Sequence, residues 1–378
     1  MSSINVSCTG RRAAPIALGK NVPWTSVRDR GSAMKLGYHF GYWDAGPPPH
    51  GQDCFIEADR LGLESIWTAE AYGSDALTPL AWWGSRTERI ALGTDLIQMS
   101  ARTPTATAMA AMTLDHLSGG RSVIGIGASG PQVVEGWYGQ LYPKPLARTR
   151  EYIEIMRATI ARAAPVAYDG EFFKLPAQGG TGLGKPLRST LHPLRPEIPI
   201  YLGAEGPKNV ALAAEIADGW LPLFFSPKSD GFYREALGEG FGRPGARHKL
   251  EDFDVAASVP VIIDDDVEAA ADLIRPTLAL YIGGMGAKKT NFHLDVFVRM
   301  GYEDACATIQ EHFLAGRKSA AVAAVPTSLV EDVALVGPVA KIRDELAAWS
   351  ETVLTTLLIQ GTRGDDRELL RAMAALVG

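Results

Sequence analysis

Short apolar runs alternate along the chain with longer segments in which apolar residues recur every three or four positions. The short runs are typical of buried parallel strands, and the periodic segments are typical of helices with one apolar face. From Met34 onward this pattern predicts strands at 35–40, 64–69, 89–99, 122–127, 198–202, 255–263 and 353–359. Helices are predicted at 53–61, 104–117, 146–163 and 207–217, in a segment after 266 that Pro276 interrupts, and after Pro338.

The repeated β-α units, with no break in composition between them, predict an α/β fold of the (β/α)8 or TIM barrel type. An open doubly wound parallel sheet is the main alternative. We expect one domain over 34–378, with insertions near 172–197 and 226–330. Residues 1–33 are rich in Ser, Arg and Gly without a period, and we expect either a poorly ordered arm or an upstream start codon there.

The stretch Ile198–Trp220, IPIYLGAEGPKNVALAAEIADGW, combines a strand, a glycine-bounded turn and a helix. Gly203 and Gly206 delimit the turn, and Pro207 suits the first helical position. Gly219 is predicted to stop the helix. Free backbone N–H groups at the start of such a helix form a natural phosphate site. An ordinary connection between a strand and a helix has the same pattern, so both interpretations stay open.

The composition is that of an ordinary globular protein, with 378 residues of which 46% are hydrophobic and 21% are charged. The net charge of −6 argues against nucleic acid or an acidic membrane surface as the main partner. No apolar run is long enough to span a membrane. Cys8, Cys54 and Cys306 cannot form a disulfide framework, which favours a reducing cytoplasm. Neither the cysteines nor the 7 histidines have metal-ligand spacing, so no metal site is predicted.

Two glycine-rich stretches have the spacing of nucleotide-binding motifs but lack their context. Gly125–Gly130 matches the dinucleotide fingerprint, yet Pro131 follows it and the acidic residue Glu151 falls inside a predicted helix. Gly179–Pro186 matches a P-loop, but Pro186 replaces the required Ser or Thr and no strand precedes it. The second stretch is therefore either a mobile lid or a solvated loop.

Three polar residues lie where predicted strands should open into the mouth of a barrel: His39, Glu70 and Asp95. A buried carboxylate without a partner is costly, so Asp95 needs a reason to lie in an apolar strand. His39 and Glu70 are candidates for handling a proton. Each of the three could instead be a rim residue, a cap or part of an ion pair. Tryptophans near the strand ends could line a pocket for a planar cofactor or simply pack: Trp43, Trp67, Trp82, Trp83, Trp137 and Trp220.

Taken in order, the segments LGTDLIQM, RSVIGIGASG followed by Glu135, and IPIYLGAEGPKN with AEIADGW resemble the bacterial luciferase-like monooxygenase superfamily. GTGLGKPL and the AEGPKN turn are most similar to the branch that uses the deazaflavin coenzyme F420. The resemblance covers Met34 to Gly361. It implies a TIM barrel with insertions, in agreement with the β-α pattern.

The resemblance also implies a cofactor site at the carboxyl ends of the strands. The Asp95–Leu96 bond matches a non-prolyl cis peptide behind the flavin ring, and Ala128 and Ser129 match positions on the cofactor side of the fourth strand. The turn 204–206 matches the one whose N–H groups hold the cofactor phosphate. The implied cofactor-binding residues are Asp95, Leu96, Ala128, Ser129, Ala204, Glu205 and Gly206.

In function, the resemblance implies hydride transfer between coenzyme F420 and a small organic substrate, with His39 or Glu70 handling the proton. Sugar-phosphate dehydrogenases of this branch have Asp-His where this chain has Glu70-Ala71, and Trp43 matches a glutamate of theirs. These departures favour a more apolar substrate. An FMN-dependent monooxygenase and a non-catalytic flavin-binding barrel are the alternatives. Members of the family commonly pair, so we expect a homo-oligomer, most simply a dimer.

Overall fold

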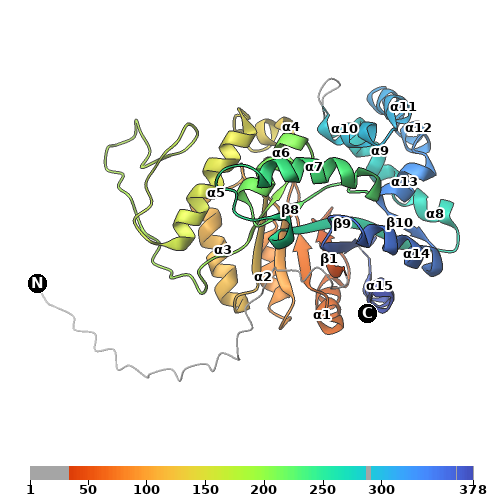
Figure 1. The fold of residues 1–378 in the computed structure, drawn as a ribbon, viewed down its shortest axis with the longest axis horizontal. Coiled ribbons are helices and arrows are strands. Elements are labelled where there is room, and N and C mark those ends of the chain that lie inside the picture. The colour runs from red at the N-terminus through yellow and green to blue at the C-terminus, as the bar shows by residue number, and fades with distance from the viewer. Residues whose placement is uncertain (1–33, 287–290, 363, 378) are drawn as a thin grey trace, which may run out of the picture.

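The computed structural model describes residues 34–286, 291–362 and 364–377, and the predicted arm 1–33 lies outside them. Eight parallel strands form a closed barrel, because β1 pairs with both β2 and β11, and β8 pairs with β9 (Figure 1). The predicted TIM barrel is confirmed, and the open doubly wound sheet is wrong. The barrel strands are β1 (Lys35–Gly41), β2 (Ser65–Thr68), β3 (Ala91–Gln98), β4 (Ser122–Gly127), β7 (Ile200–Gly203), β8 (Gly219–Leu221), β9 (Asp254–Ile263) and β11 (Thr356–Gln360).

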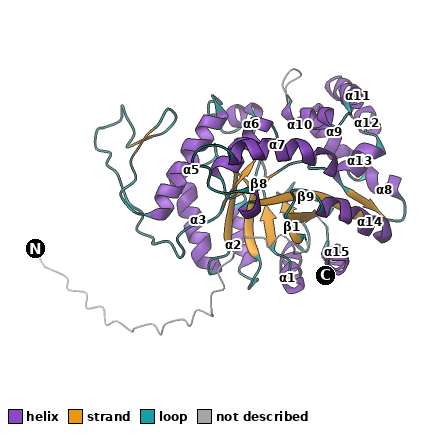
Figure 2. Cartoon of the chain, in the orientation of Figure 1, coloured by secondary structure: helices purple, strands orange, loops and turns teal. Residues whose placement is uncertain are grey.

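Helices surround the strands (Figure 2). Local signals mark some of their ends: the Thr103 side chain caps the start of α3 by accepting a hydrogen bond from the Ala106 amide, and Gly62 ends α1 with a φ of 80°. The helices around the barrel are α1 (Gly51–Leu61), α2 (Leu77–Gly84), α3 (Pro104–Ser118), α4 (Pro131–Gly136), α5 (Pro145–Ala161), α6 (Pro207–Ile216), α7 (Asp230–Phe241), α14 (Val339–Ser350) and α15 (Arg367–Val377).

Most members of a second hydrophobic cluster lie between β9 and β11 in the sequence, and the helices that carry them occupy the side of the barrel opposite α5 in Figure 1. Its buried members include Leu278, Phe297 and Ile309. The strand β10 (Leu335–Gly337) extends the sheet by pairing with the end of β9. The helices of this part are α8 (Val267–Asp272), α9 (Arg275–Gly283), α10 (Phe292–Arg299), α11 (Glu303–Leu314), α12 (Lys318–Ala323) and α13 (Thr327–Val333).

Several boundaries differ from the predicted ones. Helix α6 ends at Ile216, and Gly219, predicted to stop it, is the first residue of β8. The range 226–330 is not one insertion, because the barrel strand β9 lies inside it. The range 172–197 does run outside the barrel, and it starts in a small hairpin of β5 (Tyr168–Asp169) and β6 (Lys174–Leu175). Within the described ranges, no helix has the length and apolar character needed to cross a membrane.

The interior of the barrel is filled with large side chains toward the amino ends of the strands. The rings of Trp67 and Tyr201 lie 5.5 Å apart, and Gly93 and Gly219 leave room for them. A Cβ at Gly93 would lie 2.4 Å from the Trp67 ring, which excludes any other residue there without a shift. The Tyr201 hydroxyl donates to Asp254, the first residue of β9. Because this end is closed, a ligand site is left to the carboxyl ends of the strands.

Candidate active site

His39 and Asp95 meet in the carboxyl-terminal halves of β1 and β3. The His39 Nε2 atom lies 3.5 Å from Asp95 Oδ2 and 3.5 Å from the Asp95 carbonyl oxygen. Only 12% and 15% of the two side chains are exposed. Burial raises the pKa of Asp95 to about 7. The Asp95 carboxyl can therefore gain or lose a proton near neutral pH. The structure brings together two residues that the sequence analysis named separately.

Leu96 follows Asp95 in an irregular part of β3. The register of β3 against β4 shifts between Thr94 and Ile97, and the Asp95–Leu96 bond is cis, as the resemblance implied. The Leu96 side chain lies over two glycines: a Cβ at Gly127 would be 2.7 Å from Leu96 Cδ2, and one at Gly203 would be 2.3 Å away. Glycine at the ends of β4 and β7 thus leaves the space that Leu96 fills.

Ala128 and Ser129 continue from β4 toward α4. Ser129 has a φ of 60°, and its carbonyl accepts a hydrogen bond of 2.7 Å from the Tyr142 hydroxyl. Both residues are only partly buried. Their position beyond Gly127 places them at the same end of the barrel as Leu96.

The turn between β7 and α6 offers main-chain donors. Ala204 is tied to β8, because its amide donates to Leu221 at 3.4 Å and its carbonyl accepts from Trp220 Nε1 at 2.8 Å. The amides of Glu205 and Gly206 have no acceptor among the residues that the structure describes. A Cβ at Gly206 would meet nothing within 4 Å. Two donors at the start of a ten-residue helix, beside open space, fit an anionic group such as a phosphate.

Two residues of α10 flank this turn and were missed by the sequence. The His293 Nδ1 atom lies 2.9 Å from the Glu205 carboxylate, and Arg299 donates to the Glu205 carbonyl at 3.3 Å. The His293 ring contacts the Glu205 carboxylate, and the positive charge of Arg299 beside the turn partly offsets the negative charge that Glu205 brings to it. No sequence signal links Glu205 to residues 88 and 94 positions away.

Glu70 has a different environment from the one expected of a proton donor. Its Oε1 atom accepts from the Gln98 amide at 2.9 Å and from Arg102 Nη1 at 2.5 Å, and its Oε2 accepts from the Ala76 amide at 3.1 Å. The Glu70 amide donates to the Leu96 carbonyl at 3.2 Å. The side chain is 4% exposed. Both carboxylate oxygens are thus occupied, and the arrangement joins β2 to the irregular part of β3.

This chain is similar to known proteins over most of its length. The family model described as luciferase-like monooxygenase matches residues 36–356. A protein of Mycobacterium tuberculosis, whose name places it provisionally among the coenzyme F420-dependent oxidoreductases, is 55% identical over 92% of this chain and 99% of its own length. A 5,10-methylenetetrahydromethanopterin reductase of Archaeoglobus fulgidus is 34% identical over 60% of this chain and 64% of its own.

Solved structures share the fold. The coenzyme F420-dependent tetrahydromethanopterin reductase of Methanopyrus kandleri superposes with a TM-score of 0.75 at 22% identity, covering 92% of this chain and 99% of that one. An F420-dependent secondary alcohol dehydrogenase superposes with a TM-score of 0.72 at 16% identity, covering 91% and 98%. At these identities the likeness concerns the architecture alone.

Proposed function

Because this chain belongs to the luciferase-like monooxygenase family, we propose that it is a coenzyme F420-dependent oxidoreductase. It would transfer a hydride between the cofactor and a small, fairly apolar organic substrate. The mycobacterial relative, similar over nearly the whole of both chains, supports F420 as the cofactor. Above all, the proposal rests on the turn before α6, where the amides of Glu205 and Gly206 face no acceptor in the described part of the chain.

The turn and α6 would hold the cofactor phosphate. The Glu205 and Gly206 amides would donate to its oxygens, at the positive end of the α6 dipole. Arg299, whose guanidinium lies 3.3 Å from the Glu205 carbonyl, adds a positive charge beside the turn. Ala204 would act through its backbone, since its bonds to Leu221 and Trp220 hold the turn against β8.

The carboxyl ends of β3 and β4 would hold the ring system. Leu96 presents an apolar surface there, and Asp95, Ala128 and Ser129 border the same end of the barrel. When bound, the deazaflavin supplies the hydride chemistry, while the protein orients the reactants and excludes water. His39 and Asp95, 3.5 Å apart, would hold or move the accompanying proton. Glu70 would keep β3 in position, because its carboxylate is already bonded to Gln98, Ala76 and Arg102.

The residues that follow β1 and β2 at the carboxyl end of the barrel favour an uncharged substrate. Trp43, on the loop after β1, packs against Trp83 with ring centroids 5.4 Å apart, and Ala71 follows Glu70 with no ionisable side chain. Neither position supplies the positive charge that a sugar phosphate needs. We therefore propose an alcohol, carbonyl or unsaturated bond in an apolar molecule as the reacting group.

Equilibrium binding of coenzyme F420 and of FMN, followed by fluorescence, tests the proposal. We expect F420 to bind more tightly, without oxygen consumption during turnover. A Gly206→Val variant should fold, because nothing lies within 4 Å of the added Cβ, and it should lose at least about tenfold in F420 affinity. Gly238→Val, at an exposed glycine of α7 with equally open space, is the matched control.

Tighter FMN binding with oxygen consumption would instead identify a flavin monooxygenase. F420 affinity unchanged by Gly206→Val, in a folded variant, would remove the turn from the cofactor site. Binding of F420 without turnover on a broad panel of alcohols, aldehydes and enones would favour a barrel that only binds the cofactor.

A further inference from the structure

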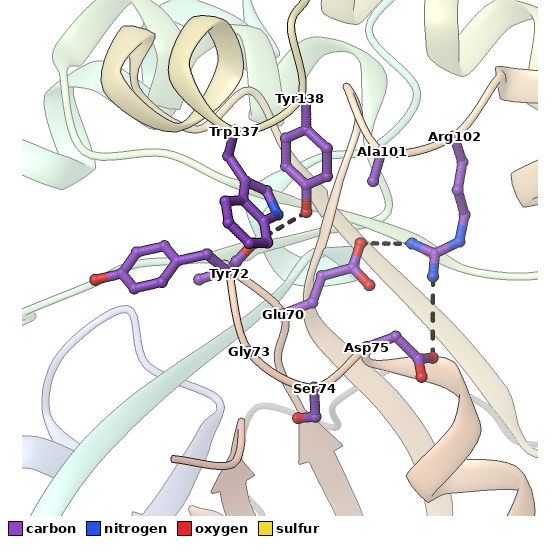
Figure 3. Close-up of a pocket in the computed structure, with 10 residues that line it drawn as sticks. Glu70, Tyr72, Gly73, Ser74, Asp75, Ala101, Arg102, Trp137 and Tyr138 are labelled. Carbon is purple, nitrogen blue, oxygen red and sulfur yellow. Dashed lines mark hydrogen bonds and ion pairs between the residues drawn. The ribbon is translucent and has the colours of Figure 1, made fainter. Parts of the chain in front are cut away.

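A cavity of about 250 Å³ opens between the loop that follows β2 and the end of α4 (Figure 3). The loop 70–75 forms one side, and Trp137 and Tyr138 form another. Arg102 and Ala101, which follow β3, complete the lining. None of the proposed cofactor-binding residues lines this cavity, and the Glu70 carboxylate that does is already bonded within the protein.

The cavity adjoins the proposed ring site through two contacts. The Glu70 amide donates to the Leu96 carbonyl at 3.2 Å, so a residue that lines the cavity is bonded to the irregular part of β3. The Trp43 amide donates to Ser74 Oγ at 3.0 Å, which ties the loop after β1 to the other side. A molecule in the cavity would therefore lie next to a ring that rests on Leu96, close enough for one substrate to span both.

Aromatic side chains line the cavity without being packed in the core. Tyr72 is 51% exposed and Trp137 is 65% exposed. Within the described part of the chain, neither ring is paired with another aromatic ring, whereas Trp43, Trp67, Trp83 and Trp220 all are. In Figure 3 the Trp137 and Tyr138 side chains lie next to each other across the cavity from Arg102, and the Tyr72 ring points away from Arg102 beside them. Exposed aromatic faces grouped at a cavity are typical of a binding site for an apolar planar group.

The charges of the cavity disfavour an anion. Arg102 is its one cation among the lining residues, and Glu70 already accepts from it at 2.5 Å. Asp75 lies 3.9 Å from the same guanidinium, so two carboxylates face one positive charge. The Ser74 hydroxyl oxygen accepts from Trp43, which leaves its proton available to an oxygen of a ligand. A neutral molecule with a hydroxyl or carbonyl oxygen therefore suits the cavity better than a carboxylate or phosphate.

From this arrangement we infer that the cavity is a substrate subsite for a planar aromatic group of one or two rings that carries no negative charge. Its volume supports this size, because an apolar cavity of about 150 Å³ already accepts benzene. The aromatic group would stack against Trp137, and its oxygen would receive a hydrogen bond from the Ser74 hydroxyl. As a substrate subsite this inference rests on the proposed function, whereas the binding of the group can be measured without it.

The test is calorimetric titration of the full chain, alone and saturated with F420, with 2-naphthol as a neutral probe and 2-naphthoate as its anionic counterpart. We expect 2-naphthol to bind saturably and 2-naphthoate to bind at least about tenfold more weakly. Trp137→Ala should weaken 2-naphthol at least about tenfold. Trp82→Ala is the matched control, because Trp82 is 73% exposed on α2 and outside the cavity, and its effect should stay within about twofold.

The same variants are titrated with F420 to separate the two proposals. Unchanged F420 affinity in Trp137→Ala, together with loss of 2-naphthol, supports a substrate subsite. Loss of F420 affinity in that variant would assign the cavity to the cofactor and overturn the inference. Equal binding of the two naphthalenes, or equal effects of the two tryptophan variants, would also overturn it. If wild-type protein failed to bind F420 but kept Trp137-dependent 2-naphthol binding, the proposed function would fail while the aromatic site stood.

Discussion

The His39 imidazole on β1 lies 3.5 Å from the Asp95 carboxylate on β3, although β2 runs between the two strands. Asp95 sits where β3 loses its regular register with β4. The contact therefore depends on the irregular backbone of one strand and on a histidine 56 positions earlier in the chain. Burial at this point raises the pKa of Asp95 to about 7.

Replacing Asp95 by Asn should change how stability depends on pH. The pKa of Asp95 is raised by burial from 3.8 to about 7, so the folded protein binds this proton more tightly than the unfolded chain does. Stability should therefore fall as the pH rises from about 4 to about 7, by up to about 4 kcal/mol. Asp95→Asn mimics the protonated form and should be the more stable protein at about pH 8, with the difference vanishing near pH 4.

Urea unfolding across this range measures the effect. Asp265→Asn, at an exposed position, is the control and should follow the wild-type curve. Parallel curves for Asp95→Asn and wild type would show that the carboxyl group ionises normally in the fold.

Adding a methyl group at Gly203 should create a collision with Leu96. The new Cβ would lie 2.3 Å from Leu96 Cδ2, so Gly203→Ala should cost about 1–3 kcal/mol of unfolding free energy. Leu96→Ala frees that space, and the double variant should be at least about 1 kcal/mol more stable than the sum of the single effects predicts. A double-mutant cycle by chemical denaturation checks this. Gly206→Ala, with open space around its Cβ, should be nearly neutral, and strict additivity would contradict the contact.

Removing the charge of Glu70 should destabilise the protein. The carboxylate is 4% exposed and accepts hydrogen bonds from Arg102, Gln98 and Ala76. Glu70→Gln therefore loses the ion pair with Arg102, and its NH2 group must face one of these donors. We expect a loss of about 3 kcal/mol in the free energy of unfolding. Arg102→Ala combined with it should cost less than the two changes separately. A Glu70→Gln variant with wild-type stability but altered pH dependence of turnover would instead favour the proton-handling role that the sequence suggested.

Protonation of Asp218 at low pH should lower the free energy of unfolding. Burial raises the pKa of this carboxyl, but hydrogen bonding by His248 and the charge of Arg157 outweigh burial and lower it to about 2. Its stabilising effect is therefore present above about pH 4 and lost as the pH falls toward 2, with a size of about 2 kcal/mol. Asp218→Asn should be less stable than wild type at pH 6, and the gap should shrink on acidification. Thermal unfolding at several pH values decides this, and a gap that stays constant down to pH 2 would contradict it.

Elements with a strong local pattern could be predicted from the sequence. The run SVIGIG is β4 to the residue, and Pro104 and Pro207 begin α3 and α6 as expected. Strands of three residues could not be predicted from the sequence, because β8 and β10 are too short to show a period. Helix α15 was also missed, although Leu370 and Met373, three positions apart, pack in the core.

By itself, the sequence determined the alternation of strands and helices, and with it the barrel. The spacing of apolar residues and the positions of glycine and proline define these elements within a few neighbouring residues. It also determined the turn at Glu205–Gly206, whose donors arise from local backbone geometry. Only the tertiary structure decided that His39 faces Asp95, that Arg102 neutralises Glu70, and that His293 pairs with Glu205. These contacts join residues 32 to 88 positions apart, and only the packing of the whole fold, which no local pattern encodes, brings them together.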